Sequence, residues 1–229
     1  MKKLLITILV GVLGGASASL YFKAPKKVND FIQLRAENAA VRKVEGSSHV
    51  IYMESVVAGQ AGCSATSIGP HVLLTASHCE QPTGTLTIDG KSGVKILKVY
   101  RDENDHSILF LDGVKFDQVS KVTPRKLRDR EFVFIWGNPG DTGVQFVKDL
   151  RTGKYLTQNI FKGRLVDVYD LESHHGDSGS GIFDVNGNVV DVLSIGGNLK
   201  VPHYGDLDTA TGALELAFEQ AKYEEAAKF

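Results

Sequence analysis

Short apolar runs separated by turn residues dominate the chain from residue 49 to about residue 205. Pairs such as Gly-Pro, Asp-Gly and Asn-Gly, which favour tight turns and hairpins, separate several of them. The runs predicted as strands are residues 50–57, 65–68, 72–75, 86–88, 94–100, 107–111, 131–136, 144–147, 161–168, 181–184 and 189–194. Many short strands with closely spaced turn signals predict an all-β domain, either a barrel or a sandwich.

Both ends of this region show helical spacing instead. Apolar residues recur at roughly helical intervals between residues 24 and 48, and a Gly-Ser-Ser sequence ends the pattern. We interpret residues 23–48 as a helical spacer, and a packed helix, a stalk and a propeptide are all compatible with it. In residues 209–229, apolar side chains set among Glu and Lys predict a C-terminal helix.

The first 22 residues have the pattern of an export signal. Lys2 and Lys3 precede an apolar run at 4–15, and Ala-Ser-Ala at 16–18 is the small-residue pattern that signal peptidases cleave. The uncharged stretch 4–22 is also just long enough to span a bilayer. We therefore expect an exported protein, periplasmic or secreted, with a retained membrane tether through residues 4–22 as the alternative.

Composition narrows the function classes. The 229 residues carry 26 basic and 27 acidic side chains, so the basic excess typical of nucleic-acid binders is missing. Without the N-terminal segment, roughly 180 residues remain, which suits one all-β domain or two small barrels that share a cleft. Dense charge between residues 112 and 130 marks a soft boundary. We expect one unit at 49–229, with barrels at about 49–120 and 121–205.

The two cysteines, Cys63 and Cys79, favour a disulfide. An even count in an exported chain points to a bridge. Two cysteines without a matched histidine pair would make a poor zinc site. Reduced, buried thiols are the alternative, and no metal is expected.

The strongest chemical signal is the sequence Gly-Asp-Ser-Gly-Ser around Ser178. Acyl transfer needs an exposed hydroxyl beside backbone N–H groups that can hold an oxyanion, and the N–H groups of Gly176 and Ser178 would serve here. A serine hydroxyl also needs a neighbouring base. His78 follows an apolar strand and precedes Cys79, and a histidine near neutral pKa suits that role. Taken alone, the serine motif has a Gly/Ser-rich hairpin turn as its alternative, and His78 has a surface loop beside a structural disulfide.

An acidic partner for the histidine is found at the start of another apolar strand. Asp105 directly precedes such a run, where a carboxylate can be partly buried and can orient the imidazole. Asp102 is the competing candidate, but it lies in a more polar stretch.

These pieces together resemble the chymotrypsin-like serine peptidases, over about residues 50–200. The strings Thr-Ala-Ser-His-Cys at 75–79, Asp-His-Ser-Ile-Leu at 105–109 and Gly-Asp-Ser-Gly at 176–179 match the family's three motifs, with a serine in place of alanine in the second. The order His, Asp, Ser is also the family's. An α/β-hydrolase would run Ser, Asp, His.

The resemblance implies a fold and a reaction. The fold would be all-β, with two six-stranded antiparallel barrels and the C-terminal helix. The reaction would be peptide-bond hydrolysis through an acyl-enzyme on Ser178, with His78 as base and Asp105 as its partner and with no cofactor. Cys63–Cys79 matches the family's histidine-loop disulfide, and Ser194, Ile195 and Gly196 match the strand that pairs with the substrate backbone.

Specificity and activation are less defined. Glu172, six residues before Ser178, matches the base of the family's primary pocket, where a carboxylate would favour Lys or Arg; a solvent-facing Glu172 is the alternative. No Ile-Val-Gly-Gly start precedes residue 50, so activation by a freed N-terminus is not expected and the partner of Asp177 is open. We expect a serine endopeptidase acting on proteins or peptides. The alternatives are a non-catalytic binding protein on the same fold and a membrane-tethered processing enzyme.

Overall fold

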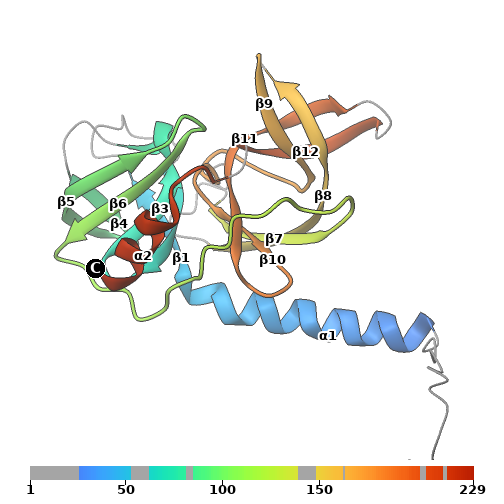
Figure 1. Cartoon of the computed structure of the whole chain (residues 1–229), viewed down its shortest axis with the longest axis horizontal. Coiled ribbons are helices and arrows are strands. Elements are labelled where there is room, and N and C mark those ends of the chain that lie inside the picture. Colours follow the sequence, from blue (N-terminus) through green and yellow to red (C-terminus); the bar gives the residue numbers. More distant parts are fainter. Residues whose placement is uncertain are drawn as a thin grey trace, which may run out of the picture.

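Two closed antiparallel barrels stand side by side in the computed structural model (Figure 1). The structure describes residues 26–52, 62–80, 85–138, 148–161, 163–201, 205–213 and 216–229. Each barrel has six strands, and a helix follows the second barrel near the end of the chain. The expected chymotrypsin-like double barrel is therefore confirmed.

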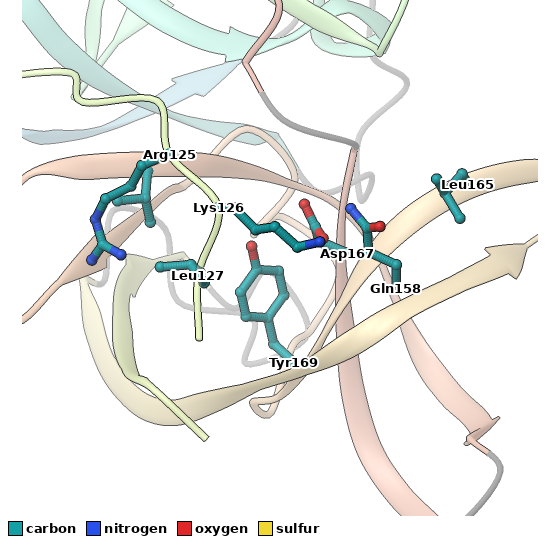
Figure 2. Close-up of a pocket in the computed structure, with 8 residues that line it drawn as sticks. Arg125, Lys126, Leu127, Gln158, Leu165, Asp167 and Tyr169 are labelled. Carbon is teal, nitrogen blue, oxygen red and sulfur yellow. The ribbon is translucent and has the colours of Figure 1, made fainter. Parts of the chain in front are cut away.

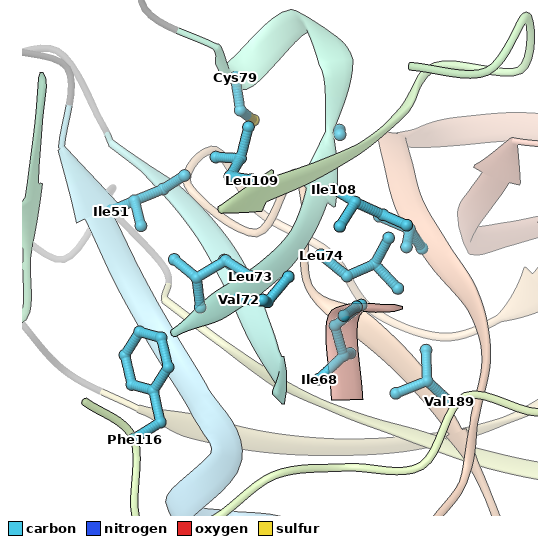
Figure 3. Close-up of a cluster of buried hydrophobic side chains, with 14 of the residues drawn as sticks. Ile51, Ile68, Val72, Leu73, Leu74, Cys79, Ile108, Leu109, Phe116 and Val189 are labelled. Carbon is cyan, nitrogen blue, oxygen red and sulfur yellow. The ribbon is translucent and has the colours of Figure 1, made fainter. Parts of the chain in front are cut away.

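The first barrel supplies most of the hydrophobic core. Its strands are β1 (Ser48–Tyr52), β2 (Cys63–Gly69), β3 (Val72–Ala76), β4 (Thr85–Ile88), β5 (Lys91–Arg101) and β6 (His106–Asp112), paired in the order β1-β2-β3-β6-β5-β4. Strand β3 is buried along its whole length and β6 at all but its last residue. Continuous burial means that both faces of these strands are covered. The core cluster reaches Val189 of the second barrel, so it also forms part of the contact between the barrels (Figure 3).

The second barrel closes in the order β10-β11-β12-β9-β8-β7. Its strands are β7 (Phe132–Gly137), β8 (Asp149–Phe161), β9 (Arg164–Asp170), β10 (Gly181–Asp184), β11 (Val189–Val201) and β12 (Gly205–Ala213). Val133, Ile135, Tyr169 and Ile182 are fully buried in a separate core cluster inside it. Each barrel thus has its own interior.

The C-terminal helix α2 (Gln220–Lys228) returns to the first barrel (Figure 1). It packs against β2, where a side chain on Gly69 would place its Cβ 1.8 Å from the carbonyl oxygen of Ala226. The prediction that the helix begins at residue 209 is wrong, because residues 209–213 belong to β12. There they pair with both β11 and β9, and these backbone hydrogen bonds close the barrel.

Helix α1 (Lys26–Val44) contacts the body through its C-terminal end, which the 3-10 turn η1 (Glu45–Ser47) joins to β1. Ala40 and Val44 are buried, whereas Ile32 and Leu34 are 59% and 54% exposed. No helix in the described part of the chain is both long and apolar enough to cross a membrane. The predicted export segment and the predicted strand at 144–147 lie outside the described residues.

Candidate active site

His78 and Asp105 come from neighbouring loops of the first barrel. His78 lies in the 3-10 turn η2 (Ser77–Cys79), directly after β3, and Asp105 lies just before β6, the partner of β3. The Nδ1 atom of His78 is 2.8 Å from Oδ2 of Asp105, and the backbone N–H of His78 donates to Oδ1 at 3.0 Å. The carboxylate therefore holds both the ring and the backbone of the histidine.

The second barrel also contacts this carboxylate. The hydroxyl of Ser194, on β11, donates to Oδ2 of Asp105 at 2.7 Å. Burial disfavours a charged carboxyl, but the hydrogen bonds from His78 and Ser194 outweigh it and lower the pKa of Asp105. An ionised Asp105 accepts the Nδ1 hydrogen of His78, which leaves Nε2 with a lone pair. A neutral imidazole held in this tautomer can accept a proton at Nε2.

The loop that carries Ser178 is hydrogen-bonded to β2 of the first barrel. The carbonyl oxygen of Ser178 accepts the backbone N–H of Ser64 at 2.7 Å, and the Ser64 hydroxyl donates to the carbonyl of Gly176 at 2.8 Å. Gly179 has a φ of +89°, and a Cβ there would lie 2.1 Å from the carbonyl oxygen of Ser64. Only glycine fits this close approach.

The hydroxyl of Ser178 is directed to the second barrel. It donates to the carbonyl oxygen of Ser194 at 3.4 Å, and no hydrogen bond joins it to His78 among the described atoms. The candidate nucleophile and base are therefore not hydrogen-bonded to each other in this structure. Catalytic hydrogen bonds are often long or misaligned in the absence of substrate.

The backbone of the serine loop leaves two donors unused. Within the described residues, neither the N–H of Gly176 nor that of Ser178 donates a hydrogen bond. Gly176 has a φ of +100°, a left-handed conformation that glycine adopts without a steric penalty. Among the described residues, both N–H groups therefore lack an acceptor.

The expected disulfide between Cys63 and Cys79 is present. It joins the start of β2 to η2, and Sγ of Cys79 lies 3.5 Å from the carbonyl oxygen of Ser178. A sulfur in a disulfide has no hydrogen, so this is a packing contact. His78 lies beside the two sulfur atoms, but neither is a thiolate that could bind zinc. The bridge instead fixes the loop that carries the base.

A buried ion pair joins the serine loop to strand β8 of the second barrel. Asp177 is fully buried, and its two carboxylate oxygens accept hydrogen bonds of 2.6 Å each from Nη1 and Nη2 of Arg151 on β8. The backbone N–H of His174 also donates to Asp177 at 2.6 Å. Gly137 makes room for this pair, because a Cβ there would lie 2.2 Å from Asp177 Oδ1. The open question of the partner of Asp177 is answered by Arg151.

Sequence reasoning missed Arg151. Of the two histidines nearest to Asp177 in the chain, His174 and His175, the backbone N–H of His174 donates a hydrogen bond to it. The available signal was weak: Arg151 lies in the mostly polar sequence Lys-Asp-Leu-Arg-Thr at 148–152, a stretch not predicted as a strand. A basic residue in such a stretch gives no hint that its side chain is buried.

Two further acidic candidates lie apart from the His78 ring. The side chain of Glu172 is 60% exposed, and its carboxylate lies 3.1 Å from Nε2 of His174. Asp102, the competing partner for the base, contacts His106 instead, at 2.5 Å from Nδ1. The structure therefore pairs Asp105, and not Asp102, with His78.

The strand segment 194–196 has one uncovered edge. Strand β10 pairs with β11 up to Val192, whereas β12 pairs with it from Leu193 onward on the other side. Beyond Val192, no described strand covers the β10-side edge of Ser194, Ile195 and Gly196. Such an edge can accept an extended peptide as an added strand.

A pocket in the second barrel lies elsewhere. Its walls include Lys126, Gln158, Asp167 and Tyr169, and none of His78, Asp105 or Ser178 lines it (Figure 2). It is separate from the candidate active site.

Comparison with known proteins agrees with this geometry. Residues 63–191 match the trypsin-like peptidase domain. No curated protein matches the sequence. Among solved structures, the active form of the Rv3671c protease from M. tuberculosis is similar, with a TM-score of 0.58, 17% identity and 89% of each chain covered. The inactive form of a serine-to-alanine mutant of the same protein has a TM-score of 0.59 at 16% identity, over 78% of this chain and 86% of that one.

At such low identity the solved structures support the fold alone. The family match covers more than half of the sequence and includes His78, Asp105 and Ser178. This chain belongs to the trypsin-like peptidase domain family.

Proposed function

We propose that this serine peptidase is an endopeptidase that hydrolyses peptide bonds through an acyl-enzyme on Ser178. The observation that carries the proposal is the 2.8 Å contact between His78 Nδ1 and an ionised Asp105, on the loop that faces Ser178. In this arrangement the Nε2 lone pair of His78 takes the hydroxyl proton as Ser178 attacks the substrate carbonyl. Asp105 stabilises the imidazolium that forms.

The remaining steps use groups of the serine loop. The free N–H groups of Gly176 and Ser178 donate to the oxyanion of the tetrahedral intermediate. His78 then gives its proton to the leaving amine, and the C–N bond breaks. A water molecule, deprotonated by His78, attacks the ester and releases the acid and the free Ser178 hydroxyl.

Arg151 supports this site without a freed N-terminus. Its guanidinium neutralises Asp177, the residue next to Ser178 in the chain, inside the protein. A bidentate pair with a planar guanidinium fixes both the position and the orientation of the carboxylate. We infer that the serine loop is held in its working conformation by a residue of the same domain and needs no proteolytic activation.

The substrate is proposed to bind as an extended strand on the open edge of Ser194, Ile195 and Gly196. Glu172 is proposed to favour Lys or Arg at the cleaved bond. Its exposed carboxylate can form a charge-assisted hydrogen bond with a cationic side chain. The competing contact is with His174, which would have to release it.

For the whole chain we propose export, with residues 1–22 as a signal peptide or anchor, 23–48 as a spacer and 49–229 as the peptidase domain. Barrels at about 49–120 and 121–205 make up that domain. Retention of residues 4–22 would make the protein a membrane-tethered processing protease.

One observation favours a second function, a non-catalytic binding protein. The Ser178 hydroxyl donates to Ser194 and not to His78. In such a protein the hydroxyl would stay there when a peptide binds.

Substitution of the nucleophile tests the proposal. We expect Ser178→Ala to lower peptide hydrolysis to background while the unfolding transition stays within about 0.5 kcal/mol of the wild type, as is usual for a small change without core burial. We also expect a fluorophosphonate probe to label Ser178 in the wild type. Ser92→Ala, on an exposed part of β5, should behave like the wild type in both assays. A folded wild type without an adduct would support the binding protein instead.

The Arg151–Asp177 pair gives a separate prediction. Arg151→Met leaves a buried carboxylate without its charge partner, which costs about 3–5 kcal/mol. We expect a lower free energy of unfolding in urea and, under conditions where the variant is folded, a kcat at least tenfold lower. Arg164→Met, on the surface of β9, is the control and should change neither quantity. An unchanged kcat in folded Arg151→Met would show that the pair does not support the serine loop.

Cleavage of a peptide library tests the role of Glu172. We expect the wild type to prefer Lys or Arg before the scissile bond and Glu172→Gln to lose most of this preference, since the charge is removed but the shape is kept. Glu103→Gln, on an exposed loop of the first barrel, is the matched control. An equal preference in wild type and Glu172→Gln would place the specificity elsewhere.

N-terminal sequencing of the mature protein tests the export proposal. We expect cleavage directly after Ala18, because residues 16–18 fit a signal peptidase site. An intact N-terminus in the membrane fraction would establish the tethered form.

A further inference from the structure

A second histidine–carboxylate cluster lies directly beside the candidate active site. His106 follows Asp105 in the chain, and its side chain is fully buried. Its Nδ1 is 2.5 Å from Oδ2 of Asp102, and its Nε2 is 3.5 Å from Oδ1 of Asp191. Both carboxylates are at least 95% buried, with 5% and 2% of their side chains exposed. The proposed reaction uses none of these three groups.

The cluster connects the two barrels. Asp102 lies in the loop between β5 and β6 of the first barrel, and Asp191 lies on β11 of the second. Asp191 is fixed in its own barrel: the hydroxyl of Tyr169 donates to its Oδ2 at 2.7 Å, and Gly212 leaves the space that its carboxylate fills. Tyr169 belongs to β9 and also lines the pocket of Figure 2. The imidazole of His106 therefore lies between two carboxylates, that of Asp102 in the first barrel and that of Asp191 in the second.

Asp102 also shapes the loop that presents Asp105. Its Oδ1 accepts the backbone N–H groups of Asn104 and His106, at 2.9 Å each. Between these two residues, Asp105 has a φ of +69°, in the left-handed region that non-glycine residues rarely occupy. A strained conformation persists only when its surroundings enforce it. The Asp102 side chain, itself held by His106, provides part of that enforcement.

The buried imidazole carries a charge. Burial disfavours the imidazolium, but the hydrogen bond to Asp102 and the charges of Asp102 and Asp191 outweigh it and raise the pKa of His106 to about 9. Burial raises the pKa of the Asp191 carboxyl. Burial opposes ionisation of Asp102 as well, but the hydrogen bonds that Asp102 accepts outweigh it and lower the pKa of Asp102. Among the described residues, the phenols of Tyr169 on β9 and Tyr223 on α2 also face the cluster, and burial raises the pKa of both. At neutral pH His106 is thus the cation of the cluster.

We propose that His106 is a positioning residue: it ties Asp102 in the first barrel to Asp191 in the second and so holds Asp105 and His78 in register with Ser178. This inference rests on the proposed function. Two cross-barrel contacts run in parallel here, from Asp105 to Ser194 and from His106 to Asp191. The two partners are consecutive on one side and three residues apart on β11 on the other. If the contact between His106 and Asp191 is lost, the hydrogen bond from Ser194 is the one of these two contacts that still joins Asp105 to the second barrel.

The experiment compares His106→Gln with His49→Gln. His49 forms a similar pair with Asp89, at 2.8 Å, but both residues belong to the first barrel. We expect His106→Gln to lower kcat roughly 10- to 100-fold, the effect of a small misplacement of catalytic groups, with KM changed less than about threefold. His49→Gln should keep kcat within about twofold, even if it loses stability.

The pH profile adds a readout that a purely structural role would not move. A raised pKa means that the charged contact is complete below the ordinary histidine pKa of about 6.5 and is lost as pH rises through about 9. We therefore expect kcat of the wild type to fall across pH 9. That fall should be absent from the lower kcat of His106→Gln and present in His49→Gln.

A measurement without turnover separates this inference from the proposed function. The proton between His78 Nδ1 and Asp105 gives a low-field NMR signal, which we expect to shift or broaden in His106→Gln but not in His49→Gln. An inactive wild type with this response would refute the peptidase proposal and keep the positioning role. An active wild type in which neither kcat nor the signal responds to His106→Gln would refute the positioning role. If His106→Gln does not fold, Asp191→Asn, which keeps the shape of the carboxylate, is judged by the same two criteria.

Discussion

The structure depends on fixing one loop of the second barrel against the first. The loop around Ser178 has little secondary structure of its own, so its conformation comes from what surrounds it. From inside the second barrel, the Arg151–Asp177 pair fixes the residue next to the nucleophile. From the first barrel, Ser64 binds the carbonyl groups of Gly176 and Ser178. A buried ion pair is costly unless both charges are satisfied, and here the geometry is bidentate.

The same division runs through the whole site. His78 and Asp105 come from the first barrel and Ser178 from the second, so the proposed catalysis depends on a contact between two separately packed cores. Polar bonds at this contact, such as that from Ser194 to Asp105, have directions that apolar packing lacks. Apolar side chains such as Val189 bring the barrels together, and the polar bonds determine their register.

Local patterns in the sequence were sufficient for the fold class, for the Cys63–Cys79 bridge and for the contact between His78 and Asp105. These features follow from strand periodicity, turn residues and short motifs. Strand β12 and the role of Arg151 could not be found in this way. Residues 209–213 form a strand only because β9 and β11 offer partners on both sides. Arg151 can be buried because the fold places Asp177 next to it. The two residues are far apart in the sequence, and no local pattern connects them.

Helix α2, at the end of the described chain, packs on the first barrel. It packs on β2 against Gly69, so the first barrel is covered by residues that are synthesised after the whole second barrel. The first barrel therefore gains this covering helix only after the second barrel has been synthesised. Contacts between residues so far apart in the chain form late and slow the folding of a domain. The loops that carry His78 and Asp105 thus reach their final support only after the Ser178 loop has been made, and a partly synthesised chain lacks the complete site.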